Sequence, residues 1–312
     1  MAGGTLKILI IGKTGQLSWE LQRSVSLLGT VECVGRPEMD LTSPDSVRHM
    51  LRRIRPNLLI NAAAYTAVDK AEAESTLAMK VNAEAPAIMA QQMKAIGGLL
   101  VHYSTDFVYD GAGSSPYIES DQTGPLNVYG TAKLAGDNAV VSTDGSYLIF
   151  RTSWVYGARG HNFLRSILRL TQQGKPLRVV NDQTGSPTWS RDIATASALA
   201  IAQVCCKEPN GELSFEPTSF KRSGIYNLSS RGFVTWYCFA TAIMEQSQKF
   251  GLFNDSSPLI TPIASCDYPT PAKRPHNSRL STEKLQTTFG ITLPHWRDSL
   301  TKVIEEIANP SK

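Results

Sequence analysis

The sequence predicts an α/β protein with a doubly wound parallel sheet and a smaller, mixed α/β lobe. Short apolar runs alternate with amphipathic stretches through the first half of the chain, which is typical of parallel strands covered by helices on both faces. A glycine-rich turn follows the first apolar run directly. After about residue 155 the alternation becomes irregular, so the regular sheet is expected to lie before that point.

The expected elements of the first half follow one another as strand and helix in turn. Buried strands are expected at 6–11, 31–35, 58–63, 99–104 and 147–152. Helices are expected at 19–28, 43–54, 70–96 and 128–141. The second of these has Ser43 as its N-cap and Pro44 in its first turn, and the third has an expected break near Pro86.

The second half predicts a separate but interwoven lobe. Helices are expected at 163–171 and 191–204, and strands at 177–180 and 225–228. Residues 207–224 and 254–278 are rich in Pro, Ser and Asn and are expected to be loops. We therefore divide the chain into a nucleotide-binding domain of residues 1–155 and a substrate-binding lobe of residues 156–312.

The composition excludes several classes of protein. The chain has 312 residues, a net charge of +4 and no clustered Lys/Arg runs, which argues against a nucleic-acid partner. No apolar stretch is long enough for a membrane span or a signal sequence, so no membrane partner is expected. The five cysteines are odd in number and contain no Cys-x-x-Cys pair, which argues against disulfides or zinc and favours the cytoplasm.

The glycine-rich turn predicts a site for a dinucleotide. Gly12 permits a tight turn after the first strand, and Gly15 lets the backbone approach a pyrophosphate. The helix expected to follow, from residue 19, supplies amide donors and the positive end of its dipole next to Gln16 and Leu17. Ser18 stands where a third glycine is usual, and the glycine spacing of a P-loop is missing.

The end of the second strand bears on the choice between NADPH and NADH. NAD-specific sites usually place an acidic residue there to hold the ribose hydroxyls. Here the residue is Arg36, a candidate partner for a 2′-phosphate, which favours NADPH with NADH as the alternative. Asp40 and Leu41 follow closely and are candidates to flank the adenine.

A third pattern predicts proton transfer. Tyr129 and Lys133 are four residues apart in an expected helix, so both side chains lie on one face. An ammonium beside a phenol favours the phenolate and lowers its pKa. Thr105, at the end of the fourth strand, offers a hydroxyl to a substrate carbonyl, so the three residues could protonate a carbonyl oxygen as it becomes an alkoxide.

Together these motifs resemble the extended short-chain dehydrogenases/reductases and, among them, the dTDP-4-dehydrorhamnose reductase family. The resemblance covers nearly the whole chain and is carried by GKTGQLSWELQRS (12–24), RPNLLINAAAYTAVDKAE (55–72), VHYSTDFVYDG (101–111), PLNVYGTAKLAG (125–136), FRTSWVYG (150–157), NDQTGSPT (181–188) and YPTPAKRPHNSRLST (268–282). It implies reduction of the C4 keto group of dTDP-4-dehydro-L-rhamnose for dTDP-rhamnose biosynthesis.

The resemblance also implies roles for individual residues. Thr105, Tyr129 and Lys133 are the expected catalytic residues, and the sugar nucleotide is expected at Thr105, Asp106, Tyr129 and Trp154. The expected cofactor contacts are Gly12, Gly15, Gln16, Leu17, Arg36, Asp40, Leu41, Ala63, Ala64, Tyr65, Thr66, Tyr103, Tyr129 and Lys133.

One departure from the family concerns metal. Some members bind Mg²⁺ through acidic side chains at a dimer contact, but Arg191 and Arg297 stand at the corresponding places here. Cations cannot ligate Mg²⁺, so any homodimer is expected to lack a bridging metal. Glu20 and Asp192 are then interpreted as isolated helix-end charges.

Two other functions compete with the reductase. One is another nucleotide-sugar enzyme of this type: Phe107 after Thr105 and Asp106 disfavours a dehydratase, which has Glu there, but an epimerase uses the same Tyr/Lys pair. The other is a non-catalytic regulatory subunit that binds NADP, against which the intact Thr105, Tyr129 and Lys133 argue.

Overall fold

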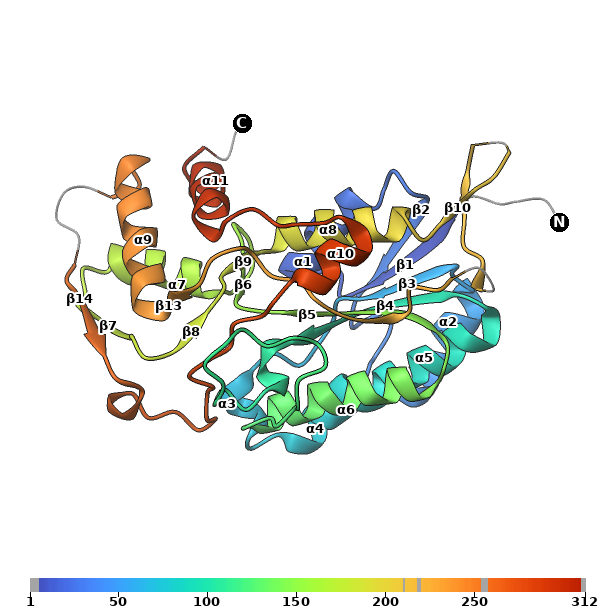
Figure 1. The fold of residues 1–312 in the computed structure, drawn as a ribbon, viewed down its shortest axis with the longest axis horizontal. Helices are drawn as coiled ribbons and strands as arrows, with labels where there is room; N and C mark the ends of the chain where they lie inside the picture. The colour runs from blue at the N-terminus through green and yellow to red at the C-terminus, as the bar shows by residue number, and fades with distance from the viewer. Residues whose placement is uncertain (1–5, 210, 218–219, 254–257, 310–312) are drawn as a thin grey trace.

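A six-stranded parallel sheet forms the centre of the computed structural model, which describes residues 6–209, 211–217, 220–253 and 258–309 (Figure 1). The strand order is β12-β5-β4-β3-β1-β2, and every neighbouring pair is parallel. The strands are β1 (Lys7–Ile11), β2 (Thr30–Val34), β3 (Leu58–Asn61), β4 (Leu99–Thr105), β5 (Ser146–Thr152) and β12 (Gly224–Asn227). The predicted Rossmann-type α/β class is confirmed.

Helices cover both faces of this sheet because side chains alternate along each strand. In β1, Ile8 and Ile10 join one buried cluster, while Leu9 and Ile11 join the other. Helices α1 (Gln16–Ser24), α8 (Ser190–Ala202) and α10 (Glu283–Phe289) lie over the first face. Helices α2 (Pro44–Ile54), α5 (Ala85–Ile96) and α6 (Val128–Ser142) lie over the second (Figure 1).

The sixth strand of the sheet comes from the second half of the chain. β12 pairs in parallel with β5, aligning Ile225 with Ile149 and Tyr226 with Phe150. The strand was expected from its sequence, but its place at the edge of the main sheet was not. The two halves therefore share one sheet, and the division at residue 155 stays a prediction.

Much of the second half, apart from β12, α8 and α10, forms a lobe with its own buried cluster. Helices α7 (Phe163–Gln172), α9 (Trp236–Lys249) and α11 (Trp296–Ala308) enclose it. The segments between these helices form three two-stranded sheets. They pair β7 (Leu177–Val180) with β14 (Ile260–Ile263), β6 (Val155–Tyr156) with β9 (Thr188–Trp189), and β8 (Thr184–Gly185) with β13 (Val234–Thr235). None of the helices α9, α10 and α11 was predicted from the sequence.

The expected helix at 70–96 is divided differently from the prediction. The chain forms α3 (Val68–Ala71), α4 (Ser75–Met79), a π-helical turn (Lys80–Glu84) and then α5. Pro86 lies within the first turn of α5, where a missing N–H costs little, so it does not break the helix. The irregularity lies one turn earlier, in the π-helical segment.

Both expected loops contain short strands, so those predictions were wrong in part. Residues 207–224 include a hairpin of β10 (Cys206–Lys207) with β11 (Leu213–Ser214) and the first residue of β12. Residues 254–278 include β14 and a 3₁₀ turn (Ser265–Asp267). Pro262 suggested a loop, but a two-stranded sheet has only edge strands, which tolerate proline. Residues 210, 218–219 and 254–257 of these segments lie outside the described residues.

Helix α6 lies unusually close to its neighbours, and two glycines make this possible. A Cβ on Gly136 would stand 2.1 Å from the carbonyl oxygen of Asn82 in the π-helical turn. A Cβ on Gly130 would stand 2.3 Å from the carbonyl oxygen of Phe107. Side chains at either position would push the helix away, so these glycines fix the depth at which Tyr129 and Lys133 enter the site.

Across the described residues, no helix is both long and apolar enough to cross a membrane.

Candidate active site

The carboxyl ends of β1, β3 and β4 open into a cavity of 640 Å³. Parallel strands bring their loops together at this edge, which is where ligands bind in open α/β sheets. Every residue that the sequence assigned to the cofactor lines the cavity: Gly12, Gly15, Gln16, Leu17, Arg36, Asp40, Leu41, Ala63, Ala64, Tyr65, Thr66, Tyr103, Tyr129 and Lys133. Its size and residue set fit a dinucleotide.

The glycine-rich turn has the geometry of an anion site. Gly12 has φ +107°, a conformation that side-chain-bearing residues rarely adopt, and its carbonyl accepts the Gly15 N–H at 2.8 Å. Helix α1 begins directly afterwards, and its N-cap Gly15 provides no side chain to bind the first amides. Ser18 is fully buried beneath the turn, with its hydroxyl 3.5 Å from the Ile11 carbonyl oxygen, so serine fits where a glycine is usual.

Arg36 and Asp40 both line the cavity, and they are close enough for the Arg36 charge to act on the Asp40 carboxylate. The Asp40 carboxylate accepts from the Thr42 backbone N–H at 2.9 Å and from the Thr42 hydroxyl at 2.8 Å. These two bonds lower the pKa of Asp40, and the nearby Arg36 guanidinium lowers it further. The Arg36 guanidinium and the remaining acceptor positions of the Asp40 carboxylate are therefore available to bind a ribose and a phosphate attached to it.

The segment Ala63–Thr66 is held in place by a residue that the sequence analysis missed. Asn82, in the π-helical turn, accepts the Tyr65 backbone N–H at 2.8 Å and donates to the Tyr65 carbonyl at 3.0 Å. Its side chain is 1% exposed. A buried asparagine inside a helical pattern was the available signal, because such an amide needs partners outside its helix.

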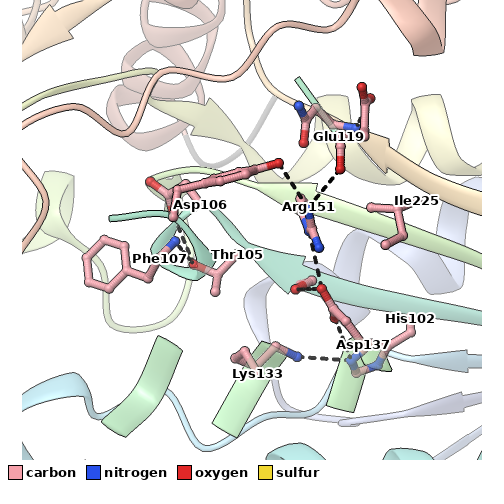
Figure 2. A network of polar contacts seen from close by, with 12 residues as sticks. His102, Thr105, Asp106, Phe107, Glu119, Lys133, Asp137, Arg151 and Ile225 are labelled. Carbon is pink, nitrogen blue, oxygen red and sulfur yellow. Dashed lines mark hydrogen bonds and ion pairs between the residues drawn. The ribbon is translucent and has the colours of Figure 1, made fainter. Parts of the chain in front are cut away.

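Lys133 lines the cavity but is almost fully buried, and its side chain points to His102 (Figure 2). Its Nζ donates to the Tyr103 carbonyl oxygen at 2.5 Å and lies 3.2 Å from Nε2 of His102. Burial lowers the pKa of Lys133 to about 8, although the Asp137 carboxylate opposes this shift. Lys133 can therefore exchange a proton near neutral pH.

Asp137 and Arg151 form a buried ion pair behind Lys133 (Figure 2). The Asp137 Oδ2 accepts from Arg151 Nε at 3.3 Å and from the Ser104 hydroxyl at 2.7 Å. Arg151 also donates to the Tyr109 hydroxyl at 2.9 Å. This pair joins α6 to β5 directly beneath the site, so it supports the helix that carries Tyr129 and Lys133.

Tyr129 lines the cavity, and the Thr105 hydroxyl lies beside its phenol. The Phe107 ring stands edge-on to the Tyr129 ring at 6.0 Å between centroids. Burial raises the pKa of Tyr129 to about 12, against which the neighbouring Thr105 hydroxyl has a smaller lowering effect. The expected lowering by Lys133 is not found, because its Nζ points to His102 and the Tyr103 carbonyl.

Asp106 is buried beside this pair and fixes the Thr105 hydroxyl. Thr105 donates its hydrogen to Asp106 Oδ1 at 2.9 Å, and Ser153 donates to Oδ2 at 3.0 Å. Burial raises the pKa of Asp106 to about 6 despite these bonds. Because a hydroxyl has one hydrogen, Thr105 must leave Asp106 before it can donate to a substrate carbonyl.

The raised pKa of Asp106 predicts a pH dependence of stability. Its pKa is higher in the folded than in the unfolded chain, so the ionised form opposes folding and its cost grows as pH rises from 4 to 7. Asp106→Asn removes this slope. The free energy of unfolding, variant minus wild type, should rise by about 2–3 kcal/mol across that range. Urea titrations at several pH values measure it, and a flat difference would contradict the shift.

The chain is similar to proteins of one family over nearly its whole length. The model of the RmlD substrate binding domain matches residues 6–309. The chain belongs to the RmlD substrate binding domain family. Within this family it is 45% identical to a dTDP-4-dehydrorhamnose reductase of Burkholderia thailandensis, over 94% of this chain and 96% of the relative. It is 40% identical to the Escherichia coli K12 protein of that name, over 97% and 98%.

Solved structures of the RmlD family have the same fold. A dTDP-4-dehydrorhamnose reductase from Clostridium acetobutylicum aligns with a TM-score of 0.85 and 33% identity, covering 96% of this chain and 98% of that one. The Bacillus anthracis protein of that name, in complex with NADP, aligns with a TM-score of 0.84 and 28% identity, covering 97% and 100%. A Thermus thermophilus UDP-glucose 4-epimerase, at 17% identity, shares the fold alone.

Trp154, expected at the sugar, lies outside the residues that line the cavity. Its indole stacks on Trp236 with 3.4 Å between ring centroids and 7° between planes. Its backbone has φ +45°, an uncommon and costly conformation for a side-chain-bearing residue. Trp154 therefore packs against the aromatic cluster of the second lobe, and a contact with sugar stays a prediction.

Arg191 occupies the place where metal ligands were considered for this RmlD-family chain. Its guanidinium binds both carboxylate oxygens of Glu20, at 3.0 and 3.2 Å, and Glu306 at 2.9 Å. Asp192 accepts from the Ser299 hydroxyl at 2.5 Å. Glu20 lies in the middle of α1 and pairs with Arg191, so its interpretation as an isolated helix-end charge was wrong. Asp192 lies in the first turn of α8, as expected of a helix-end charge. Among the described residues, no group of three or more His, Cys, Asp or Glu is arranged to hold a metal ion.

Proposed function

We propose that this chain reduces the C4 keto group of dTDP-4-dehydro-L-rhamnose to dTDP-L-rhamnose, with Tyr129 as the proton donor. The observation that carries the proposal is the placement of Tyr129 and Lys133 in the lining of a cavity that fits a dinucleotide, with the Thr105 hydroxyl beside Tyr129. Family members that match the chain almost end to end are named as reductases of this sugar nucleotide.

The residues divide the work by their hydrogen bonds and charges. NADPH, held by the glycine-rich turn, Arg36 and Lys133, would supply the hydride. With a pKa raised to about 12, Tyr129 keeps its proton at neutral pH until the carbonyl oxygen becomes a stronger base than a phenolate. Thr105 orients Tyr129, and Lys133, one turn further along α6 and with a pKa of about 8, then reprotonates the phenolate.

A turnover assay tests this function directly. The purified chain is mixed with NADPH and enzymatically prepared dTDP-4-dehydro-L-rhamnose, and loss of reduced cofactor is followed with identification of the sugar product. Formation of dTDP-L-rhamnose is expected. Interconversion of sugars without net cofactor oxidation would favour an epimerase. Tight NADPH binding with no conversion would favour the regulatory-subunit alternative.

Arg36 should set the preference for NADPH over NADH. A guanidinium at the end of β2 can form charge-assisted hydrogen bonds with a 2′-phosphate, which NADH lacks. Arg36→Ala should therefore raise KM for NADPH by roughly tenfold or more and leave KM for NADH nearly unchanged. Steady-state kinetics with both cofactors measure this. Equal effects on the two cofactors would remove Arg36 from the specificity argument.

The proposal extends to the setting of the enzyme. We infer a cytoplasmic location, supported by five cysteines that form no disulfide with one another. We also infer that no bridging metal joins any homodimer, since Arg191 already neutralises Glu20 and Glu306. Size-exclusion chromatography with and without a chelator tests the second point, and dissociation by the chelator would contradict it.

A further inference from the structure

A buried histidine lies against Lys133 on the side away from the cavity, and the reaction described above does not use it. His102, on β4, is fully buried, and its Nε2 is 3.2 Å from the lysine Nζ (Figure 2). Its Nδ1 is 3.0 Å from the side-chain amide nitrogen of Asn61, at the end of β3. The side-chain oxygen of Asn61 accepts the backbone N–H of Ala63 at 3.3 Å. These contacts form a chain from the cavity wall to Lys133.

A buried lysine that gives up a proton changes the partners it requires. An ammonium has three donors and no acceptor, whereas a neutral amine also has a lone pair that must be satisfied. The Tyr103 carbonyl accepts from Lys133 in either form. The lone pair of the neutral amine needs a donor, and the ammonium needs a second acceptor in the same place. The group in that place is His102 Nε2, which can act as either.

The bonds of Asn61 decide which nitrogen of His102 carries the proton. While the Asn61 oxygen accepts from Ala63, its NH₂ donates to Nδ1, so neutral His102 carries its proton on Nε2 and donates to a neutral Lys133. Turning the Asn61 amide presents its oxygen to Nδ1, which places the proton there and lets Nε2 accept from the ammonium. Burial and the neighbouring Lys133 hold the pKa of His102 well below its usual value, so it stays neutral in both arrangements.

Asp137 is the titratable group whose charge acts on Lys133, and its Oδ1 is also 4.0 Å from His102 Nε2. Asp137 lies on the same helix, with Arg151 of β5 behind it. Tyr129 of α6 lines the cavity, and Asp106 is buried just after β4. None of the hydrogen bonds and ion pairs recorded for these four groups reaches the lysine Nζ, so His102 is the side chain in direct contact with it.

We propose that His102, together with Asn61, is a positioning residue that gives Lys133 a matching hydrogen bond in both of its protonation states. The role in turnover rests on the proposed reductase function. In that reaction the Tyr129 O–H bond breaks as the O–H bond of the product alcohol forms. A Lys133 N–H bond then breaks as the Tyr129 O–H bond forms again, and water at the open cavity returns a proton to the amine. His102 keeps Lys133 in place while its proton is absent.

Two substitutions separate this role from simple packing. His102→Leu fills the space but offers no hydrogen bond, whereas the amide of His102→Gln can turn to donate or accept. In the leucine variant both forms of Lys133 lose a partner, but the bond of the ammonium is charge-assisted and therefore the stronger of the two. The alkaline limb of the pH profile of kcat should therefore move to lower pH by about one unit. In the glutamine variant the alkaline limb of the pH profile of kcat should stay at the wild-type position, near the Lys133 pKa of about 8. KM for the sugar nucleotide should not change in either.

Nitrogen-15 NMR of histidine-labelled wild-type protein provides a readout without substrate. The His102 signals are assigned by their loss in His102→Gln. At pH values below the pKa of Lys133 we expect the ring proton of His102 on Nδ1, and at pH values above it on Nε2. No imidazolium form should appear at either pH. An unchanged tautomer, or an alkaline limb that His102→Leu does not move, would overturn the proposal. Absence of ketosugar turnover in the wild type would instead remove the proposed function, and the tautomer measurement would still decide this inference.

Discussion

Replacement of Tyr129 by phenylalanine should lower kcat by roughly 10²- to 10⁴-fold. The substitution removes the hydroxyl that meets Thr105 and keeps the ring that packs edge-on against Phe107. The proton donor is lost while the shape of the floor is preserved. Initial rates of NADPH oxidation with saturating ketosugar measure the loss.

Two controls make this result specific. The dissociation constant for NADPH should change by less than about threefold, because the phenylalanine ring keeps the cavity wall intact. Tyr268→Phe, at an exposed position, should leave kcat unchanged. If Tyr129→Phe retained most of the wild-type rate, another group would have to protonate the alkoxide, and the assignment of Tyr129 would be wrong.

Asp137→Asn should cause the largest loss of stability among the substitutions considered. Asp137 is fully buried and is the carboxylate that pairs with Arg151, which is itself 3% exposed. An asparagine leaves the guanidinium charge uncompensated in the interior, and such single removals typically cost about 3–5 kcal/mol. Urea unfolding followed by circular dichroism measures the free energy of unfolding.

The matched control is Asp45→Asn. It also neutralises an aspartate that pairs with an arginine, Arg48, but the Asp45 side chain is 98% exposed. Solvent screens this pair, so its loss should cost under about 1 kcal/mol. Similar losses in the two variants would show that Arg151 finds another partner, and the ion pair would then be unimportant for stability.

The strands that could be predicted are those whose signal lies in a few neighbouring residues. β1, β3 and β4 are short apolar runs, and parallel strands necessarily bring their carboxyl ends to one edge. The residues that the sequence assigned to the cofactor therefore line one cavity, as expected. Tyr129 and Lys133 are among them, because their spacing within one helix places both on the same face.

The contacts that could not be predicted join residues far apart in the chain. Arg191 and Glu20 are separated by 171 positions, so local pattern gives no sign that they pair. His102 lies in an apolar strand, and only the fold places Lys133 and Asn61 against its two nitrogens. Trp154 shows a different difficulty: a loop-like sequence context did not reveal that its indole stacks on Trp236.

The place of β12 in the central sheet affects how this protein is made on the ribosome. Domains generally begin to fold while synthesis continues, starting from the N-terminus. The first five strands of the sheet are complete when β5 emerges, but β12 is translated more than seventy residues later. Until then β5 is an unpaired edge with exposed backbone groups, the kind of surface that invites association with other chains. The nascent chain can therefore associate with other chains at β5 for as long as the segment between β5 and β12 is being translated. Pausing of translation in that segment would lengthen this time.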